Sequence, residues 1–196
     1  MPAHFGYPCP GCRSTNNLHE PGCQFAGRDS QAVERAYVDV LATLSVEPVD
    51  EETLPSAAPD WSALHRQALD QLVEDHRVKE DEAGTLVVVP PEERKERLRE
   101  PDYEPLATIY RKGSVHGAHD NSVFAMIAFY EMVGFTWPET KRLVVEWLHE
   151  SGTWARGGFE EESPTELVER KRHVYEEGYG WKEKATAAKS VIDRSI

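Results

Sequence analysis

Apolar residues recur at helical spacing along most of the chain, and this pattern predicts a mainly α protein. A first apolar stripe runs through Leu44, in a helix for which Ser30 is the expected N-cap. A second stripe occupies residues 61–73 and follows Asp60, which is the expected cap of that helix. Both stripes are narrow enough to leave a polar face, as in helices that pack on one side.

The period changes between residues 76 and 89, where two short β-prone runs flank a turn. The runs are His76 to Lys79 and Leu86 to Val89, and the turn centres on Gly84. This predicts a small β-hairpin. Helices followed by a hairpin resemble a winged-helix domain, so we expect a winged-helix-like module over residues 29–90.

The rest of the chain divides into a connector and a helical bundle. Residues 91–112 hold a charged stretch and several prolines, which predict a connector. From residue 113 to 196 the pattern is helical. Asp120 or Asn121 is the expected cap of a helix that ends at Gly134.

Capping boxes mark the next two helices of this bundle. Thr136 to Glu139 opens one helix, and Ser163 to Glu166 opens another that is expected to run through Tyr175. A last helix is expected from about Trp181. The predicted fold is therefore mainly α with one small β-hairpin: a zinc knuckle, a winged-helix-like module and a C-terminal helical bundle.

The knuckle is predicted over residues 1–28, where all three cysteines of the chain lie. Cys9, Cys12, His19 and Cys23 follow the spacing C-x2-C-x6-H-x3-C. Three thiolates and one imidazole form a tetrahedral ligand set that zinc accepts, and a closed set of four is typical of a structural ion. His4 is also near and is the alternative nitrogen ligand. We therefore expect one structural Zn²⁺.

Charge and hydropathy limit the setting and the partners. The 196 residues carry 22 Lys plus Arg against 35 Asp plus Glu, a formal net charge of −13. Such a surface repels polyanions at ordinary salt and is similar to the acidic proteins of salt-loving archaea. No apolar run approaches the ~18 residues of a membrane span, and no secretory signal is visible. The sequence predicts a halophilic, cytoplasmic protein with reduced cysteines and no membrane contact.

Part of the bundle resembles a known family. Asn121 to Glu139, followed by Leu143, Trp147 and Leu148, is similar to the primase C-terminal helical domain, which follows archaeo-eukaryotic-type primases of plasmids and viruses. The resemblance covers about residues 111–180 and extends to the run from Ser163 to Tyr179. It implies an accessory role in nucleic-acid synthesis without chemistry of its own. The paired acids of a primase polymerase core are not found here. The same region also resembles a type of haloarchaeal protein.

One polar loop is the strongest candidate for ligand binding. Residues 111–121 bring glycines, two basic residues and a hydroxyl to a helix N-terminus, which is an outline of an anion site. The expected phosphate or nucleic-acid contacts are Arg111, Lys112, Ser114, His116, His119 and Asn121, together with Arg170, Lys171 and Arg172. The loop from Trp154 to Phe159 adds aromatic rings on which bases can stack. A capped helix with a solvated loop, or a second metal or acid–base site at His116, His119 and Asp120, are the alternatives.

Together these features favour a non-catalytic, zinc-containing protein that associates with DNA or RNA as a replication or transcription accessory. The alternative is a protein-interaction adaptor that uses its acidic middle module, where Glu47, Asp50, Glu51 and Glu52 share one loop. An enzyme acting through the histidine loop has the weakest support. Its residue types suit acid–base chemistry, but no further motif accompanies them.

Overall fold

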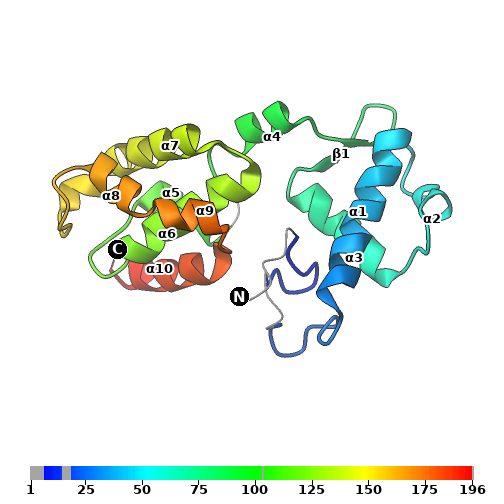
Figure 1. Cartoon of the computed structure of the whole chain (residues 1–196), viewed down its shortest axis with the longest axis horizontal. Coiled ribbons are helices and arrows are strands. Elements are labelled where there is room, and N and C mark those ends of the chain that lie inside the picture. Colours follow the sequence, from blue (N-terminus) through cyan, green and yellow to red (C-terminus); the bar gives the residue numbers. More distant parts are fainter. Residues whose placement is uncertain (1–6, 15–18, 103, 196) are drawn as a thin grey trace. The chain divides into compact units, whose positions relative to one another are not determined.

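A computed structural model describes residues 7–14, 19–102 and 104–195, which form two compact units (Figure 1). The first unit is Met1–Arg94 and the second is Lys95–Ile196. The fold is mainly helical with one two-stranded antiparallel hairpin, as the hydrophobic pattern predicted. Within the described ranges, no helix combines the length and the apolar character that crossing a bilayer requires.

The N-terminal unit consists of helices followed by the hairpin. Its elements are α1 (Ser30–Val46), α2 (Leu54–Ala57), α3 (Ala63–Glu74), β1 (Val78–Glu80), β2 (Leu86–Val88) and α4 (Pro91–Arg97), which continues across the boundary between the units. The hairpin register pairs Val78 with Val88, and Val49 forms an isolated antiparallel bridge with Leu86. The short segment between α1 and α2 therefore lies at the edge of the hairpin, next to β2.

Two of the predicted helix caps in this unit are displaced by one or two residues. Asp29, and not Ser30, is the N-cap of α1, and its carboxylate accepts the backbone N–H of Gln31 at 3.2 Å. The N-cap of α3 is Ser62, while Asp60 has a φ of 49°. Ser, Asp and Asn are nearly equivalent as caps, so the sequence alone does not decide between close neighbours.

The core of the N-terminal unit lies between α1, α3 and the hairpin. Tyr37 and Val40 of α1 and Leu72 of α3 are almost completely buried there. Cys9 and Phe25 belong to the same cluster of buried residues. The predicted knuckle therefore shares one core with residues 29–90.

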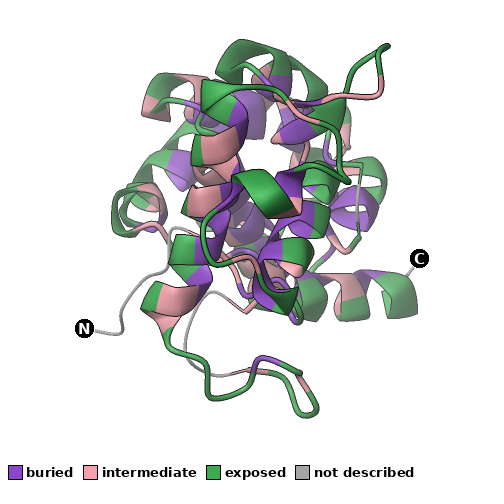
Figure 2. Ribbon diagram, turned by 90° about the vertical axis from the view of Figure 1, so that its right-hand side faces the viewer, coloured by how far each residue is buried: buried purple, intermediate pink, exposed green. Residues whose placement is uncertain are grey.

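The C-terminal unit is a helical bundle built around one helix. Its elements are α5 (Leu106–Lys112), α6 (His119–Val133), α7 (Trp137–Glu150), a 3₁₀ turn η1 (Trp154–Arg156), α8 (Pro164–Arg170), α9 (Arg172–Glu177) and α10 (Lys182–Ser195). Helix α6 packs against α5, α7, α9 and α10, so buried residues occur nearly all around it. Buried residues of its neighbours complete the same core. Figure 2 shows helices that carry buried positions, in purple, on one side and exposed positions, in green, on the other.

Helix boundaries in this unit follow some of the predicted signals and depart from others. The capping box predicted at the start of α7 is confirmed, since the backbone N–H of Thr136 donates to Glu139 Oε2 at 2.7 Å. Helix α6 begins two or three residues earlier than a cap at Asp120 or Asn121 would allow, because Ala118 is its N-cap. The predicted helix from residue 163 to 175 is divided into α8 and α9 at Lys171.

Helix α5 lies within the segment predicted to be a connector. Its buried residues Leu106 and Ile109 join the core of the C-terminal unit, and α5 packs against α10 and α6. The basic end of this helix, Arg111 and Lys112, begins the polar loop expected to bind anions. The structured bundle therefore begins before residue 113.

Candidate functional site

The cysteine and histidine side chains of the knuckle form a compact cluster of four possible metal ligands. Cys9, Cys12, His19 and Cys23 each offer one ligand atom, and these atoms all lie within 4.8 Å of one another. Two of the four side chains, Cys9 and Cys12, are buried. All three thiols are free, so no disulfide competes for them. The four residues lie close enough to bind one metal ion.

Two of the distances within the cluster match the edges of a zinc tetrahedron. Zn–S bonds of about 2.3 Å and Zn–N bonds of about 2.0–2.1 Å place two sulfurs ~3.8 Å apart, and sulfur and nitrogen ~3.6 Å apart. The Sγ atoms of Cys9 and Cys23 are 3.7 Å apart, and Cys12 Sγ lies 3.6 Å from His19 Nδ1. The predicted ligand set is therefore compatible with zinc. His4, the alternative ligand, lies outside the described residues.

Two turns of the backbone bring the ligands together. In the first, the N–H of Arg13 donates to Cys9 O at 2.7 Å and the N–H of Cys9 donates to Ser14 O at 2.8 Å. Arg13 adopts a left-handed φ of 59°, which closes this turn directly after Cys12. In the second turn, the N–H of Cys23 donates to Glu20 O at 3.1 Å.

The two buried thiols have different acidities. Burial raises the pKa of Cys9 to about 11, and the neighbouring thiols add to this effect. Burial also acts on Cys12, but hydrogen bonds from the backbone of Glu20 and Ser14 and from the two neighbouring thiols together outweigh it and lower the pKa of Cys12. Because a metal binds thiolates, metal binding at this cluster would release protons.

In the polar loop of the C-terminal unit, two of the predicted anion-binding side chains point into the protein. Ser114 and His119 are buried. His119 Nδ1 lies 3.1 Å from Ser114 Oγ, and His119 Nε2 lies 3.0 Å from the carbonyl oxygen of Gly157. The carbonyl can only accept, so Nε2 carries the proton and Nδ1 accepts from the Ser114 hydroxyl. His119 thus joins the loop at 114 to the loop at 157.

The environment of His119 favours the neutral form of its imidazole. Burial is the main cause that lowers its pKa, and the nearby side chains of His116 and Arg156 lower it further. The hydrogen bond to Gly157 acts in the opposite direction but does not outweigh burial. The ring also lies 4.3 Å from the ring of Phe159, measured between centroids.

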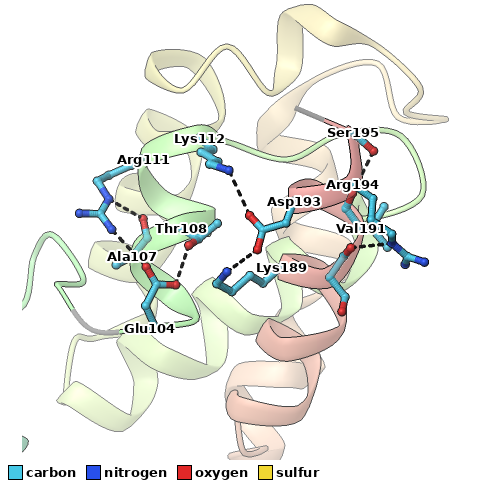
Figure 3. Close-up of polar contacts among 11 residues, drawn as sticks. Glu104, Ala107, Thr108, Arg111, Lys112, Lys189, Val191, Asp193, Arg194 and Ser195 are labelled. Carbon is cyan, nitrogen blue, oxygen red and sulfur yellow. Dashed lines mark hydrogen bonds and ion pairs between the residues drawn. The ribbon is translucent and has the colours of Figure 1, made fainter.

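The two basic residues that begin the loop are engaged in ion pairs (Figure 3). Arg111 Nη2 lies 3.2 Å from Glu104 Oε1, and Lys112 Nζ lies 3.0 Å from Asp193 Oδ1. Lys189 contacts the other oxygen of the Asp193 carboxylate, so this acid bridges α5 and α10. A phosphate would have to compete with these carboxylates for both cations.

The basic residues predicted on the later helices are also paired. Arg170, Lys171 and Arg172 each contact at least one carboxylate, and Arg172 also lies over the ring of Trp137. The partners are Glu161 for Arg170, Asp120 for Lys171, and Glu169 and Glu176 for Arg172. Of the remaining predicted contacts, His116 is exposed and Asn121 is half-buried in the first turn of α6.

Arg156, which the predicted contact set does not contain, lies beside the polar loop. Its Nη1 donates to Ser114 O at 3.0 Å and its Nη2 donates to Lys112 O at 3.1 Å. Within the part of the chain that the structure describes, no carboxylate lies within ion-pair distance of this guanidinium. Gly113 permits the approach, since a Cβ there would lie 2.6 Å from Arg156 Nη1.

Aromatic rings continue from this point along the second loop. The rings of Trp154 and Phe159 stack with centroids 4.6 Å apart, and both are half-buried. His116 lies close by, because a Cβ at Gly158 would lie 3.2 Å from its Cδ2. The sequence indicated the mixed aromatic and basic character of residues 154–159, but it did not indicate that this loop meets residues 112–116.

Comparison with known proteins identifies a family but no characterised relative. No curated protein and no solved structure matches the chain. A family model described as a family of unknown function (DUF7474) matches residues 3–195, and the chain therefore belongs to this family.

Proposed function

We propose that the protein is a non-catalytic, zinc-stabilised protein that associates with nucleic acid through two loops, residues 112–118 and 153–159. The observation that carries the proposal is that the guanidinium of Arg156 has no carboxylate partner among the described residues. It bonds to the loop that holds exposed His116, and it lies in the same loop as the stacked rings of Trp154 and Phe159. A cation beside aromatic rings is the combination that binds a phosphate backbone and stacks bases.

The contact set proposed here is narrower than the one predicted from the sequence. Arg111, Lys112, Arg170, Lys171 and Arg172 are ion-paired, so a nucleic acid would gain less from them than from an uncompensated cation. These five residues remain candidates for secondary contacts at the edge of the proposed nucleic-acid site. Arg156, His116 and Trp154 are the proposed primary contacts.

The metal is proposed to be zinc in a structural role. Three sulfurs and one nitrogen suit Zn²⁺, and four protein ligands fill a tetrahedral ion, which leaves no position for a reactant. The cluster forms part of the core of the N-terminal unit, which supports a contribution to folding. A cytoplasmic, high-salt setting belongs to the same proposal, because the acidic surface suits it and reduced thiols are needed for the metal.

The N-terminal unit is proposed to be winged-helix-like, with Val49 as a rudimentary first strand beside β2. Its α3 is a poor candidate for reading a DNA groove. Exposed Asp70 and Glu74 lie on it, and the knuckle contacts this helix through Arg13. Acidic groups near phosphates are unfavourable. We therefore place the nucleic-acid contacts on the C-terminal unit, in keeping with its resemblance to the primase C-terminal domain.

A protein-interaction adaptor is the second candidate, and the charge of the N-terminal unit favours it. Asp50, Glu51 and Glu52 are exposed in one loop, and the turn of the hairpin adds Asp81 and Glu82. Hydrogen bonds from Thr53 lower the pKa of Asp50, which favours the charged form of this carboxylate. The partner would be a protein with a basic surface.

One measurement distinguishes the two candidate functions: binding of the metal-replete chain to labelled single-stranded and duplex DNA and RNA, at salt concentrations from low to molar. The nucleic-acid proposal expects binding that weakens with salt. Arg156→Gln should lower the affinity and reduce the salt slope by about one. His116→Ala, which changes an exposed side chain, should lower the affinity without affecting thermal stability.

Arg170→Gln is the matched control, because this exposed arginine is already paired with Glu161. It should change the affinity much less than Arg156→Gln. Absence of binding at every salt concentration, or equal loss in Arg170→Gln and Arg156→Gln, would contradict the proposed site. Absence of binding combined with capture of a basic protein would favour the adaptor.

A further inference from the structure

Arg13 connects the metal cluster to the end of α3. It directly follows the ligand Cys12, and its guanidinium reaches two consecutive carboxylates. Nη2 lies 2.6 Å from Glu74 Oε2, and Nη1 lies 3.5 Å from Asp75 Oδ1. Glu74 is the last residue of α3 and Asp75 is its C-cap. One side chain of the metal turn therefore holds the C-terminus of this helix.

Asp75 in turn connects to the helix that follows the hairpin. It is buried, and Arg94 of α4, which is also buried, donates from Nε to the carbonyl oxygen of Asp75 at 3.2 Å. Arg13 and Arg94 both favour the charged form of the Asp75 carboxylate, against the effect of burial. A buried carboxylate that loses one of its cations is unfavourable, so displacement of Arg13 should loosen this junction.

A second set of contacts anchors the beginning of the knuckle to α1. The Tyr37 hydroxyl donates to Pro8 O at 2.8 Å, and the rings of Tyr7 and Tyr37 stack with centroids 4.8 Å apart. Arg77, which follows α3, lies over the Tyr7 ring at 5.0 Å. The knuckle is thus attached on both sides of Cys9 and Cys12, to α1 and to the region between α3 and β1.

We propose that the knuckle is a metal-dependent clamp. A metal ion bound at Cys12 fixes the position of Arg13, which holds Asp75 at the end of α3. Asp75 in turn holds Arg94 near the start of α4. The knuckle shares a core with α1 and α3, but an ion that closes the four-ligand set also fixes the turns that carry the ligands. The left-handed turn at Arg13 directly follows Cys12 and therefore depends on that ion. The clamp depends on the metal site and not on nucleic-acid binding.

The test is amide hydrogen exchange of the full chain, metal-replete and after chelation, with metal content measured for each sample. Chelation should increase exchange in residues 7–28, at the end of α3 and in α4, by about tenfold or more, and leave α6 and α7 unchanged. Arg13→Gln should retain one metal ion per chain and still increase exchange at the end of α3 and in α4.

Arg28→Gln is the matched control, since this exposed arginine lies in the same segment and within the described residues has no carboxylate at ion-pair distance. It should leave exchange unchanged. Asp75→Asn removes the charge from the other side of the ion pair and replaces Arg13→Gln as the test if that variant fails to fold. It should likewise increase exchange at the end of α3 and in α4. Changes confined to residues 7–28, or equal behaviour of Arg13→Gln and Arg28→Gln, would overturn the clamp alone. A chain that binds no metal would overturn it together with the metal centre.

Discussion

At the scale of single residues, spacing along the chain predicted which cysteine and histidine side chains come close enough to bind a metal ion, whereas the role of His119 depends on distant partners. Cys9 and Cys12 are separated by two residues, and one turn is enough to bring them together. His119, in contrast, bonds to the carbonyl of Gly157, which is 38 positions away. A histidine at a helix start looks the same in the sequence whether it binds a ligand or closes a loop.

The lowered pKa of His119 predicts how the C-terminal unit responds to acid. The folded state binds the proton less readily than the unfolded chain, so the stabilising contribution of neutral His119 is complete above the unfolded pKa of about 6.5. It should decrease as the pH falls below this value toward the lowered folded pKa. Thermal unfolding of the wild type between pH 8 and 5 measures the effect.

The control for this prediction is His119→Gln, which keeps a polar side chain but does not titrate in this range. Its stability should change less over the same pH interval than that of the wild type, and the difference between the two isolates the histidine. A wild type and a variant with parallel pH profiles would show that His119 does not have a lowered pKa.

At the scale of secondary-structure elements, the sequence predicted helices where the stop and start signals are local. The box at Thr136 and Glu139 and the glycine that ends α6 at position 134 are examples. Helix α5 was missed because prolines at 101 and 105 suggested a connector, and its apolar residues are too few for a clear period. The break between α8 and α9 at Lys171 could not be predicted from a proline or a glycine, because neither occurs at this point of the sequence.

The capping box of α7 gives a quantitative expectation. Thr136→Ala should lower the free energy of unfolding of the C-terminal unit by about 1 kcal/mol, because the first turn of α7 loses a side-chain partner. Chemical denaturation monitored by circular dichroism measures this change.

Thr186→Ala is the matched control for the cap. This exposed threonine lies inside α10, where its hydroxyl bonds to Lys182 O one turn earlier. Alanine is the better helix former at such a position, so the control should be neutral or slightly stabilising. Equal destabilisation by both substitutions would show that the box contributes nothing specific to α7.

At the scale of the whole molecule, the chain forms two units, and cysteines of the predicted knuckle belong to the core of the first. The sequence pattern predicted the faces that each segment buries, but not which faces meet. The bond from Tyr37 to Pro8 joins positions 29 apart, and the ion pair of Arg13 reaches Glu74 at the end of α3. Contacts of this length have no signature in the local hydrophobic period.

The proposed structural role of zinc and the proposed clamp both require the metal centre. X-ray absorption spectroscopy at the zinc edge, on protein purified without added chelator and with measured metal content, tests it most directly. We predict one zinc ion per chain, with three sulfurs at about 2.3 Å and one nitrogen at about 2.0 Å, and loss of that nitrogen in His19→Ala. A metal-free chain with an intact fold, or a zinc shell of oxygens, would contradict the account.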